Sequence, residues 1–204
     1  DRHLVSSQEE NALERAKDAL DRETPLRELP DLAQAPELRG FCFLTAKPVL
    51  YVWNVPDSDL DRPVPDDSPG QAHLAISAKL ERELAEIEDI DERQEFLQDL
   101  GLTCSALDRI ITETSTLLGL ITFLTAGEKE VRAWKVGQGA TAPEAAGVIH
   151  SDLQKGFIRA EVLSWEDFLS VRDFKDAKDK GLLRLEGKDY MVRDGDIITF
   201  RFNV

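Results

Sequence analysis

The sequence has no apolar run that approaches the ~18–20 residues of a membrane-spanning helix, and no signal peptide opens it. It contains only two cysteines, Cys42 and Cys104, which lie far apart, with no C-x-x-C pattern and no histidine at ligand spacing. These absences argue against a membrane protein, a disulfide framework and a zinc site. We therefore predict a cytoplasmic protein with no membrane contact, two free and mostly buried thiols, and no metal ligands.

The sequence also lacks the phosphate-binding loop G-x-x-x-x-G-K-[ST], because the stretches that start at Gly70 and Gly127 both fail that pattern. Without this loop a chain has no phosphate cradle, no catalytic lysine and no magnesium-binding hydroxyl. We therefore predict no catalytic residue in this chain and no nucleotide hydrolysis by it alone. The chain begins at Asp1 without a methionine, which favours a fragment of a longer product.

Charge is distributed unevenly along the chain. Residues 1–118 contain 12 Lys and Arg against 26 Asp and Glu, whereas residues 119–204 contain 13 against 14. The acidic front would repel a phosphate backbone, so any contact with RNA is expected from the rear. The pattern of elements changes near 118–120, where short strands separated by Gly and Asp turns begin, and we predict a domain boundary there.

The front of the chain opens with a predicted helix. Ser7-Gln8-Glu9-Glu10 has the form of a capping box, and apolar residues follow it at helical spacing. Proline disfavours helix in the residue before it, so this helix should end near Thr24-Pro25. Residues 1–39 are therefore predicted to form a helical, coiled-coil arm and its connector, and a packed surface helix is the alternative.

Two apolar strands follow, with helices behind them. Pro48–Trp53 is a nearly continuous apolar run, which is typical of a strand buried on both faces of a parallel sheet. His73–Ile76 is a second short strand. Helices are expected from Lys79, at roughly 91–100 and at 104–118, and this order indicates an α/β fold.

The rear of the chain reads as a small α+β module. Val131–Val136 and Phe157–Leu163 are predicted strands, Trp165–Ser170 a short helix, and Thr141-Ala142-Pro143-Glu144 a capping box that opens a helix to about His150. Asp194-Gly195 is a two-residue hairpin signal, flanked by predicted strands at 190–193 and 197–204.

Polar residues follow both strands of the front at the point where each strand ends. In open α/β sheets, ligands bind at the carboxyl ends of parallel strands. Asn54-x-x-Asp57 and Ser77-Ala78-Lys79 resemble the N-K-x-D and S-A-K base-binding loops of GTPase-type P-loop proteins. An Asp carboxylate can accept two hydrogen bonds from guanine, and an Asn amide can bond a base edge or tie neighbouring loops together. Ordinary turn chemistry is the alternative for Asn54 and Asp57. The candidate base-binding residues are Asn54, Val55, Asp57, Ser77, Ala78 and Lys79.

A resemblance to a known family rests mainly on the rear. Residues 118–134, 139–150 and 156–162 resemble the TGS domain of the YchF-type Obg-like ATPases, and so do 184–190, 194–196 and the ending Phe200-Arg201-Phe202-Asn203-Val204. The likeness extends more loosely to residues 44–52. It implies a C-terminal remnant of a P-loop nucleotide-binding domain with a helical arm over 1–39 and 40–118, followed by a β-grasp (TGS) domain over 119–204.

The family binds and hydrolyses ATP, often in preference to GTP, and associates with ribosomes. The resemblance therefore implies ATP or GTP with Mg²⁺, whose ligands would lie in the missing N-terminal part. Family members typically carry N-x-x-E where this chain has Asp57, and the usual lysine is Val55 here. The choice of base consequently depends on Asp57. An RNA or ribosome contact through the TGS domain is expected at Arg132, Lys135, His150, Lys155 and Arg159.

Two functions remain open from the sequence. The chain could be part of an Obg-like ATPase whose catalytic half lies upstream, or a non-catalytic TGS module that binds RNA or protein on a truncated nucleotide fold. His150, Ser151 and Asp152 do not form a catalytic triad, because triad members converge from separate places in a fold. We expect a helix C-terminal turn there.

Overall fold

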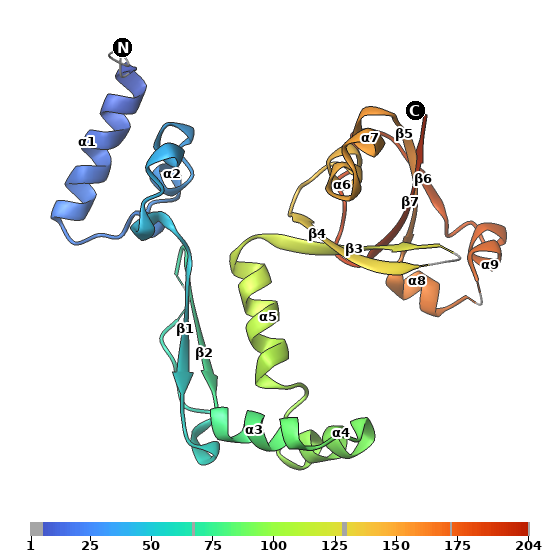
Figure 1. Ribbon diagram of the computed structural model, residues 1–204, viewed down its shortest axis with the longest axis horizontal. Helices are drawn as coiled ribbons and strands as arrows, with labels where there is room; N and C mark the ends of the chain where they lie inside the picture. The colour runs from blue at the N-terminus through green and yellow to red at the C-terminus, as the bar shows by residue number, and fades with distance from the viewer. Residues whose placement is uncertain (1–5, 67, 128–129, 172, 204) are drawn as a thin grey trace. The chain divides into compact units, whose positions relative to one another are not determined.

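The computed structural model describes residues 6–66, 68–127, 130–171 and 173–203. The chain divides into two compact units, Asp1–Leu117 and Leu118–Val204 (Figure 1). In the described part of the chain no helix is long and apolar enough to cross a membrane, and no three His, Cys, Asp or Glu side chains converge as metal ligands.

The first unit opens with a small helical cluster. Helix α1 (Ser7–Asp21) begins after Ser6, whose hydroxyl accepts the Glu9 N–H at 3.1 Å, so the capping box predicted at Ser7 is wrong by one residue. Ser6 has the extended backbone that an N-cap requires (φ −69°, ψ 150°). The helix buries alanines against leucines of the next segment, as a packed surface helix does. That segment contains η1 (Leu26–Glu28), α2 (Pro30–Ala33), η2 (Pro36–Phe41) and η3 (Leu44–Ala46).

Strands β1 (Val49–Asn54) and β2 (Gln71–Ile76) form a parallel pair in the register Val49–Gln71 to Asn54–Ile76. Burial of β1 on both faces was predicted, and this is wrong for the described residues. Tyr51, Val52 and Trp53 are 40–45% exposed, because the described sheet has only two strands and β1 has a neighbour on one side alone. The apolar β2, in contrast, has Leu74 and Ala75 buried.

Three helices follow this pair of strands and complete the first unit. Helix α3 carries its apolar residues Leu80 and Leu84 on one face, where they pack with Leu97 of α4. Helix α5 is tied to β2 by the Arg109 guanidinium, which donates to the Ala75 carbonyl at 3.2 Å. The bounds are α3 (Ala78–Glu86), α4 (Ile90–Asp99) and α5 (Ala106–Leu117), and the short η4 (Asp57–Asp59) lies between β1 and β2.

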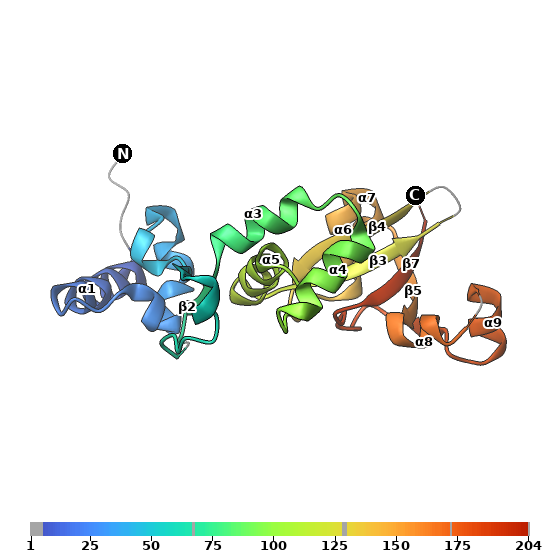
Figure 2. The same ribbon diagram turned by 90° about the horizontal axis from the view of Figure 1, so that it is seen from below.

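The second unit contains one mixed five-stranded sheet in the order β4-β3-β7-β5-β6. Strand β3 pairs antiparallel with β4 and parallel with β7, and β5 pairs antiparallel with both β7 and β6. Helices α6 and α7 cover one face, and α8 and α9 lie away from them in both views (Figures 1 and 2). The bounds are β3 (Leu120–Ala126), β4 (Val131–Gly137), α6 (Ala142–Ile149), α7 (Ser151–Lys155), β5 (Phe157–Ser164), α8 (Trp165–Leu169), α9 (Phe174–Asp179), β6 (Arg184–Glu186) and β7 (Asp196–Phe202).

Helix α6 packs closely on the sheet because its inner face is made of alanines. Ala142, Ala145 and Ala146 are fully buried in the core of the unit, against side chains such as Phe123. The predicted capping box is confirmed: the Glu144 carboxylate accepts the Thr141 N–H at 2.7 Å and its hydroxyl at 2.8 Å. These two hydrogen bonds from Thr141 lower the pKa of Glu144.

The hairpin predicted around Asp194-Gly195 is wrong. Residues 190–193 form no strand, and Met191 makes only an isolated bridge to Thr141. The Asp194-Gly195 turn instead joins β7 to β3: the Asp194 carboxylate accepts the Thr122 N–H at 2.7 Å, and the Gly195 N–H donates to the Thr122 carbonyl at 2.8 Å. Gly195 has φ +79°, and a Cβ there would lie 2.2 Å from Trp165 Cδ1, so only glycine fits.

The two cysteines are free, as predicted, but they are not buried. Cys42 is exposed and Cys104 is partly exposed. The general tendency of cysteine to be buried does not hold where the thiol lies in a connector, as Cys42 does directly after η2.

A buried carboxylate organises the side of the second unit next to β6. Asp196 is only 2% exposed, and it accepts the Tyr190 hydroxyl at 2.7 Å and the Arg193 N–H at 2.9 Å. The Arg184 guanidinium lies 3.5 Å from Asp196 and donates to the Tyr190 hydroxyl at 3.2 Å. A buried charge is tolerated only when it is paired and hydrogen-bonded in this way. Burial, followed by the hydrogen bond to Asp196, raises the pKa of Tyr190.

Replacing Tyr190 with phenylalanine should lower the free energy of unfolding of the second unit by about 1–3 kcal/mol, because Asp196 loses a donor while it stays buried. Urea unfolding followed by amide resonances of that unit measures the change, with the exposed Tyr51→Phe as the matched control. Since the pKa of Tyr190 is raised on folding, its contribution is complete below pH ~10 and is lost as the pH rises through the higher folded value. Equal unfolding curves for Y190F and the parent chain would contradict this role.

Candidate functional site

The six residues predicted to bind a nucleotide base lie together in the first unit. Strands β1 and β2 are parallel, and the last pair in their register is Asn54 with Ile76. Both strands therefore end at the same edge of the sheet, and the two loops that follow them are neighbours. Helix α3 then begins directly after the second loop, with Ser77 as its N-cap.

Asn54 joins the two loops. Its side-chain carbonyl accepts the Ala78 N–H at 3.1 Å, and the adjacent Val55 N–H donates to the Ile76 carbonyl at 2.8 Å. Val55 is 7% exposed, so its side chain is part of the packing beneath the loops. The side-chain amide of Asn54 therefore ties the two loops together. The Ala78 N–H is already bonded to Asn54.

Asp57 holds the same two loops from the other side. The Ser77 hydroxyl donates to Oδ1 of Asp57, and the Lys79 ammonium donates to Oδ2 at 2.8 Å. Ser77 is buried, and its oxygen also accepts the Leu80 N–H at 3.2 Å as the helix cap. The hydrogen bond from Lys79, followed by that from Ser77, lowers the pKa of Asp57, and the same contact raises the pKa of Lys79.

This arrangement leaves capacity for a ligand. A carboxylate has about four lone-pair positions, and two of those on Asp57 are used. The Asp57 side chain is 34% exposed, so its remaining positions can be reached from solvent. An ionised carboxylate of this kind accepts well from a pair of adjacent N–H donors, such as those on the edge of guanine. The residues present therefore fit a nucleotide base.

The five residues predicted to contact RNA do not form one patch. Side chains alternate between the faces of a strand. Arg132 shares the helix-covered side of β4 with Trp134, and its guanidinium lies 4.1 Å from the Trp134 ring. Lys135 lies on the opposite side of the sheet from Arg132. Arg159 of β5 also lies on that opposite side, because its neighbour Ala160 faces the core, and it pairs with Arg201 of β7. Lys155 belongs to α7.

His150 ends α6 as its C-cap, as expected, but Ser151 and Asp152 begin another helix instead of continuing that turn. It caps a second short helix, α7, through Nδ1, which accepts the Asp152 N–H at 3.2 Å.

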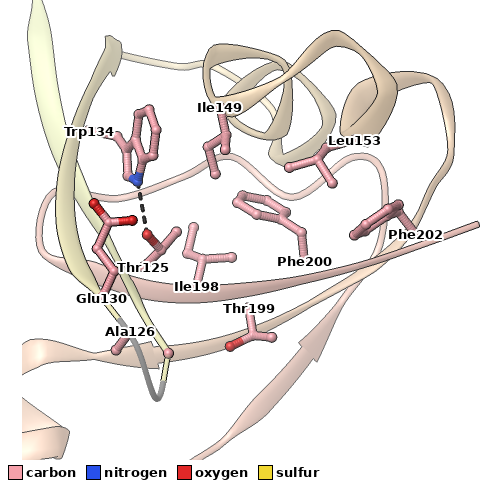
Figure 3. A pocket seen from close by; sticks show the side chains of 11 residues that line it. Thr125, Ala126, Glu130, Trp134, Ile149, Leu153, Ile198, Thr199, Phe200 and Phe202 are labelled. Carbon is pink, nitrogen blue, oxygen red and sulfur yellow. Dashed lines mark hydrogen bonds between the residues drawn. The ribbon is translucent and has the colours of Figure 1, made fainter.

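A pocket in the second unit was not predicted from the sequence. Its volume is about 540 Å³, and its walls come from β3, β4, β7 and the α6–α7 turn (Figure 3). Phe200, Phe202 and Ile198 form one apolar wall, and the Trp134 indole N–H donates to the Thr125 hydroxyl at 2.9 Å beside it. The period-two apolar pattern of β7 indicates that wall, whereas Ile149 and Leu153 come from two other elements, α6 and α7.

Both units thus have mixed α/β folds, and the first has a polar, loop-built edge suited to a nucleotide base. A family model, YchF-GTPase_C, described as a protein of unknown function (DUF933), matches residues 120–203. The chain is 49% identical over 174 residues to the ribosome-binding ATPase YchF of Haemophilus ducreyi, across 82% of this chain and 48% of that protein. It is 42% identical over 203 residues to the protein of the same name from Bacillus subtilis, across 94% of this chain and 55% of the relative.

Solved structures of similar proteins also match the chain. The Schizosaccharomyces pombe YchF GTPase matches with a TM-score of 0.71 and 26% identity, across 98% of this chain and 57% of that one. A GTP-binding protein from Pyrococcus horikoshii, 19% identical across 95% of this chain and 57% of its own, has the same general fold, with a TM-score of 0.50. The chain belongs to the YchF family and corresponds to the C-terminal part of its members. It spans about half the length of the curated relatives it matches.

Replacing Lys79 with alanine should raise the pKa of Asp57 toward its ordinary value of 3.8, because Lys79 is the largest cause of its lowering. A carbon-13 NMR titration of the Asp57 carboxyl measures the shift. Since the pKa is lowered on folding, the stabilising contact is complete above pH ~4 and is lost as the pH falls through the lower folded value. Glu83→Gln is the control, because Glu83 contacts Lys79 at 3.6 Å but does not touch Asp57. An unchanged titration in K79A would refute the contact.

Proposed function

We propose that this chain is the rear part of an Obg-like ATPase of the YchF family, which binds and hydrolyses ATP with Mg²⁺ and works on the ribosome in the cytoplasm. The observation that carries the proposal is the joined pair of loops, Asn54–Asp57 and Ser77–Lys79, at the carboxyl ends of two parallel strands. The bacterial relatives are named ribosome-binding ATPases, and this supports both the nucleotide hydrolysis and the ribosome association. The phosphate and Mg²⁺ ligands would then come from a P-loop outside this chain.

In this proposal the first unit supplies the helical arm and connector, residues 1–39, and the rear of the P-loop domain, residues 40–118. Residues 119–204 act as a TGS domain of the β-grasp type. Its first and last strands lie side by side in parallel at the centre of a mixed sheet, and one main helix packs on one face, which supports this assignment.

The residues of this chain would hold the base and leave the phosphate chemistry to the other part. Asp57 accepts donors from the base edge. Asn54 and Ser77 keep the two loops at a fixed separation, and Lys79 holds the Asp57 carboxylate in position through its hydrogen bond to Oδ2. Guanine offers a carboxylate two adjacent donors, whereas adenine offers its exocyclic amine only. We favour ATP because of the family, but Asp57 could restore the contact with guanine, so the choice of base depends on this residue.

A second function is favoured by one observation. Both oxygens of Asp57 are bonded within the chain, so the two loops are held together without any ligand. A non-catalytic module, in which the TGS domain binds RNA or protein and the nucleotide fold only supports it, would use the loops in that way.

Nucleotide binding separates these two functions. In the longer protein that contains this chain, competition binding should give a tighter Kd for ATP than for GTP, and Asp57→Asn should weaken base recognition by about tenfold, the value of one charge-assisted hydrogen bond. Asp59→Asn, an exposed position in the same turn, is the control. A far tighter Kd for GTP would overturn the preference for ATP, and unchanged affinity in D57N would favour the non-catalytic module. Magnesium-dependent turnover by residues 1–204 alone would contradict the need for a second part.

Ribosome association should depend on the cations of the second unit. Alanine at Arg132, Lys135, Lys155 and Arg159 should reduce co-sedimentation with ribosomes and flatten its salt dependence by about one unit of slope for each phosphate that the variant no longer neutralises. The control removes the same charge at other exposed lysines of the unit: Lys175, Lys178, Lys180 and Lys188. Equal losses in the two variants would show a net-charge effect instead of a contact.

A further inference from the structure

The first turn of helix α5 contacts the chain on both sides of the second base-binding loop, Ser77–Lys79. Before the loop, the Arg109 guanidinium donates to the carbonyl of Ala75 in β2 at 3.2 Å. After the loop, the carboxylate of Glu81, in the first turn of α3, accepts two N–H groups at the start of α5. One helix therefore holds the loop from both of its ends.

Glu81 completes the N-terminus of α5. Its Oε1 accepts the Ala106 N–H at 2.6 Å, and its Oε2 accepts the Leu107 N–H at 3.3 Å. The next N–H of the helix, that of Asp108, donates to the Ser105 hydroxyl at 3.1 Å. The first N–H groups of a helix have no partner within the helix itself. A side chain of α3 that accepts two of them therefore fixes where α5 begins relative to α3.

The backbone of Glu81 is bonded to the same loop. Its N–H donates to the Ser77 carbonyl at 3.1 Å, as the first hydrogen bond of α3. The Ser77 hydroxyl in turn donates to the Asp57 carboxylate. Glu81 is thus one residue away, through hydrogen bonds, from both the start of α5 and the serine that contacts Asp57.

Arg109 bonds a carbonyl on the outer edge of β2. Successive carbonyls of a strand point to opposite edges. The Ile76 carbonyl accepts the Val55 N–H on the β1 side at 2.8 Å, so the Ala75 carbonyl points to the other edge, where the described sheet has no further strand. Ala75 is only 4% exposed, and a buried carbonyl without a donor is unfavourable. Arg109 supplies that donor and holds the end of β2 against α5.

We propose that Glu81 and Arg109 are positioning residues for base recognition, a role that rests on the function proposed above. In the described structure their side chains bond to α5 and β2, and the groups suited to the base belong to Asn54, Asp57 and the second loop. They act by keeping the second loop at a set distance from Asp57. Hydrogen bonds weaken steeply when their angle is wrong, so a displaced loop weakens contacts with the base and leaves the phosphates unaffected.

The test compares two dissociation constants in the longer protein that contains this chain. One is the Kd for ATP with Mg²⁺, and the other is the Kd for tripolyphosphate with Mg²⁺, which carries the phosphates without a base. Glu81→Ala and Arg109→Met should each raise the Kd for ATP by about tenfold, the effect of one misaligned hydrogen bond, and the Kd for tripolyphosphate by less than about twofold. A purely structural role would change both constants together or neither.

Conservative variants should restore base recognition in part. Glu81→Gln keeps one acceptor oxygen for α5, and Arg109→Lys keeps a donor for Ala75, so each should lose less affinity for ATP than E81A or R109M. The matched controls are Glu86→Ala and Arg82→Ala on the exposed side of α3, where these two side chains pair with each other at 3.3 Å. Both controls should leave the two constants unchanged.

The inference and the proposed function fail in different ways. If the longer protein binds no ATP, or if D57N binds it as tightly as the parent, the proposed function fails and the inference fails with it. If D57N weakens ATP binding while E81A and R109M leave the ratio of the two constants unchanged, the inference alone is overturned. It is also overturned if the controls change that ratio equally. If E81A or R109M fails to fold, the ratio measured for E81Q and R109K decides instead.

Discussion

The parallel pairing of β1 with β2 is the constraint on which the candidate site depends. Because both strands run in the same direction to the same edge, residues more than 20 positions apart in the chain become neighbours. Asn54 and Asp57 then bond to the loop that opens α3, and Ser77 serves both as the cap of that helix and as a donor to Asp57. Ser77 thus fixes both the start of α3 and the position of the Asp57 carboxylate.

The second unit uses its sheet in two different ways. At the centre, β7 begins with the buried carboxylate of Asp196, whose Oδ2 accepts from the Tyr190 hydroxyl and from the Arg193 N–H. At the β4 edge, no described strand pairs on the outer side, and five of the seven residues are exposed. Strand β4 also contributes to the core through Val136 and Trp134, whereas Ala133 lies on the other side of the strand.

Local signals in the sequence predicted much of this structure. The helix after Thr141 and the six residues of the candidate site could be found because capping and strand-end patterns act over a few positions. Ser6 and Ser7 are both able to cap α1, and only the backbone dihedral angles show that Ser6 is the N-cap. The burial of β1 could not be predicted, since it depends on which strands lie beside it. Asp194-Gly195 has the composition of a hairpin, but its groups bond to Thr122, far away in the chain.

That last contact also has a consequence for how the second unit folds. Thr122 and Asp194 are 72 positions apart, and they join the first strand of the unit to its last. Closing so long a loop costs entropy before any central contact forms, and mixed sheets with distant pairings fold slowly for this reason. The β3–β4 hairpin can form early, but it remains without its central neighbour until β7 arrives. During synthesis, this unit must therefore wait for nearly all of its own sequence before its core can close.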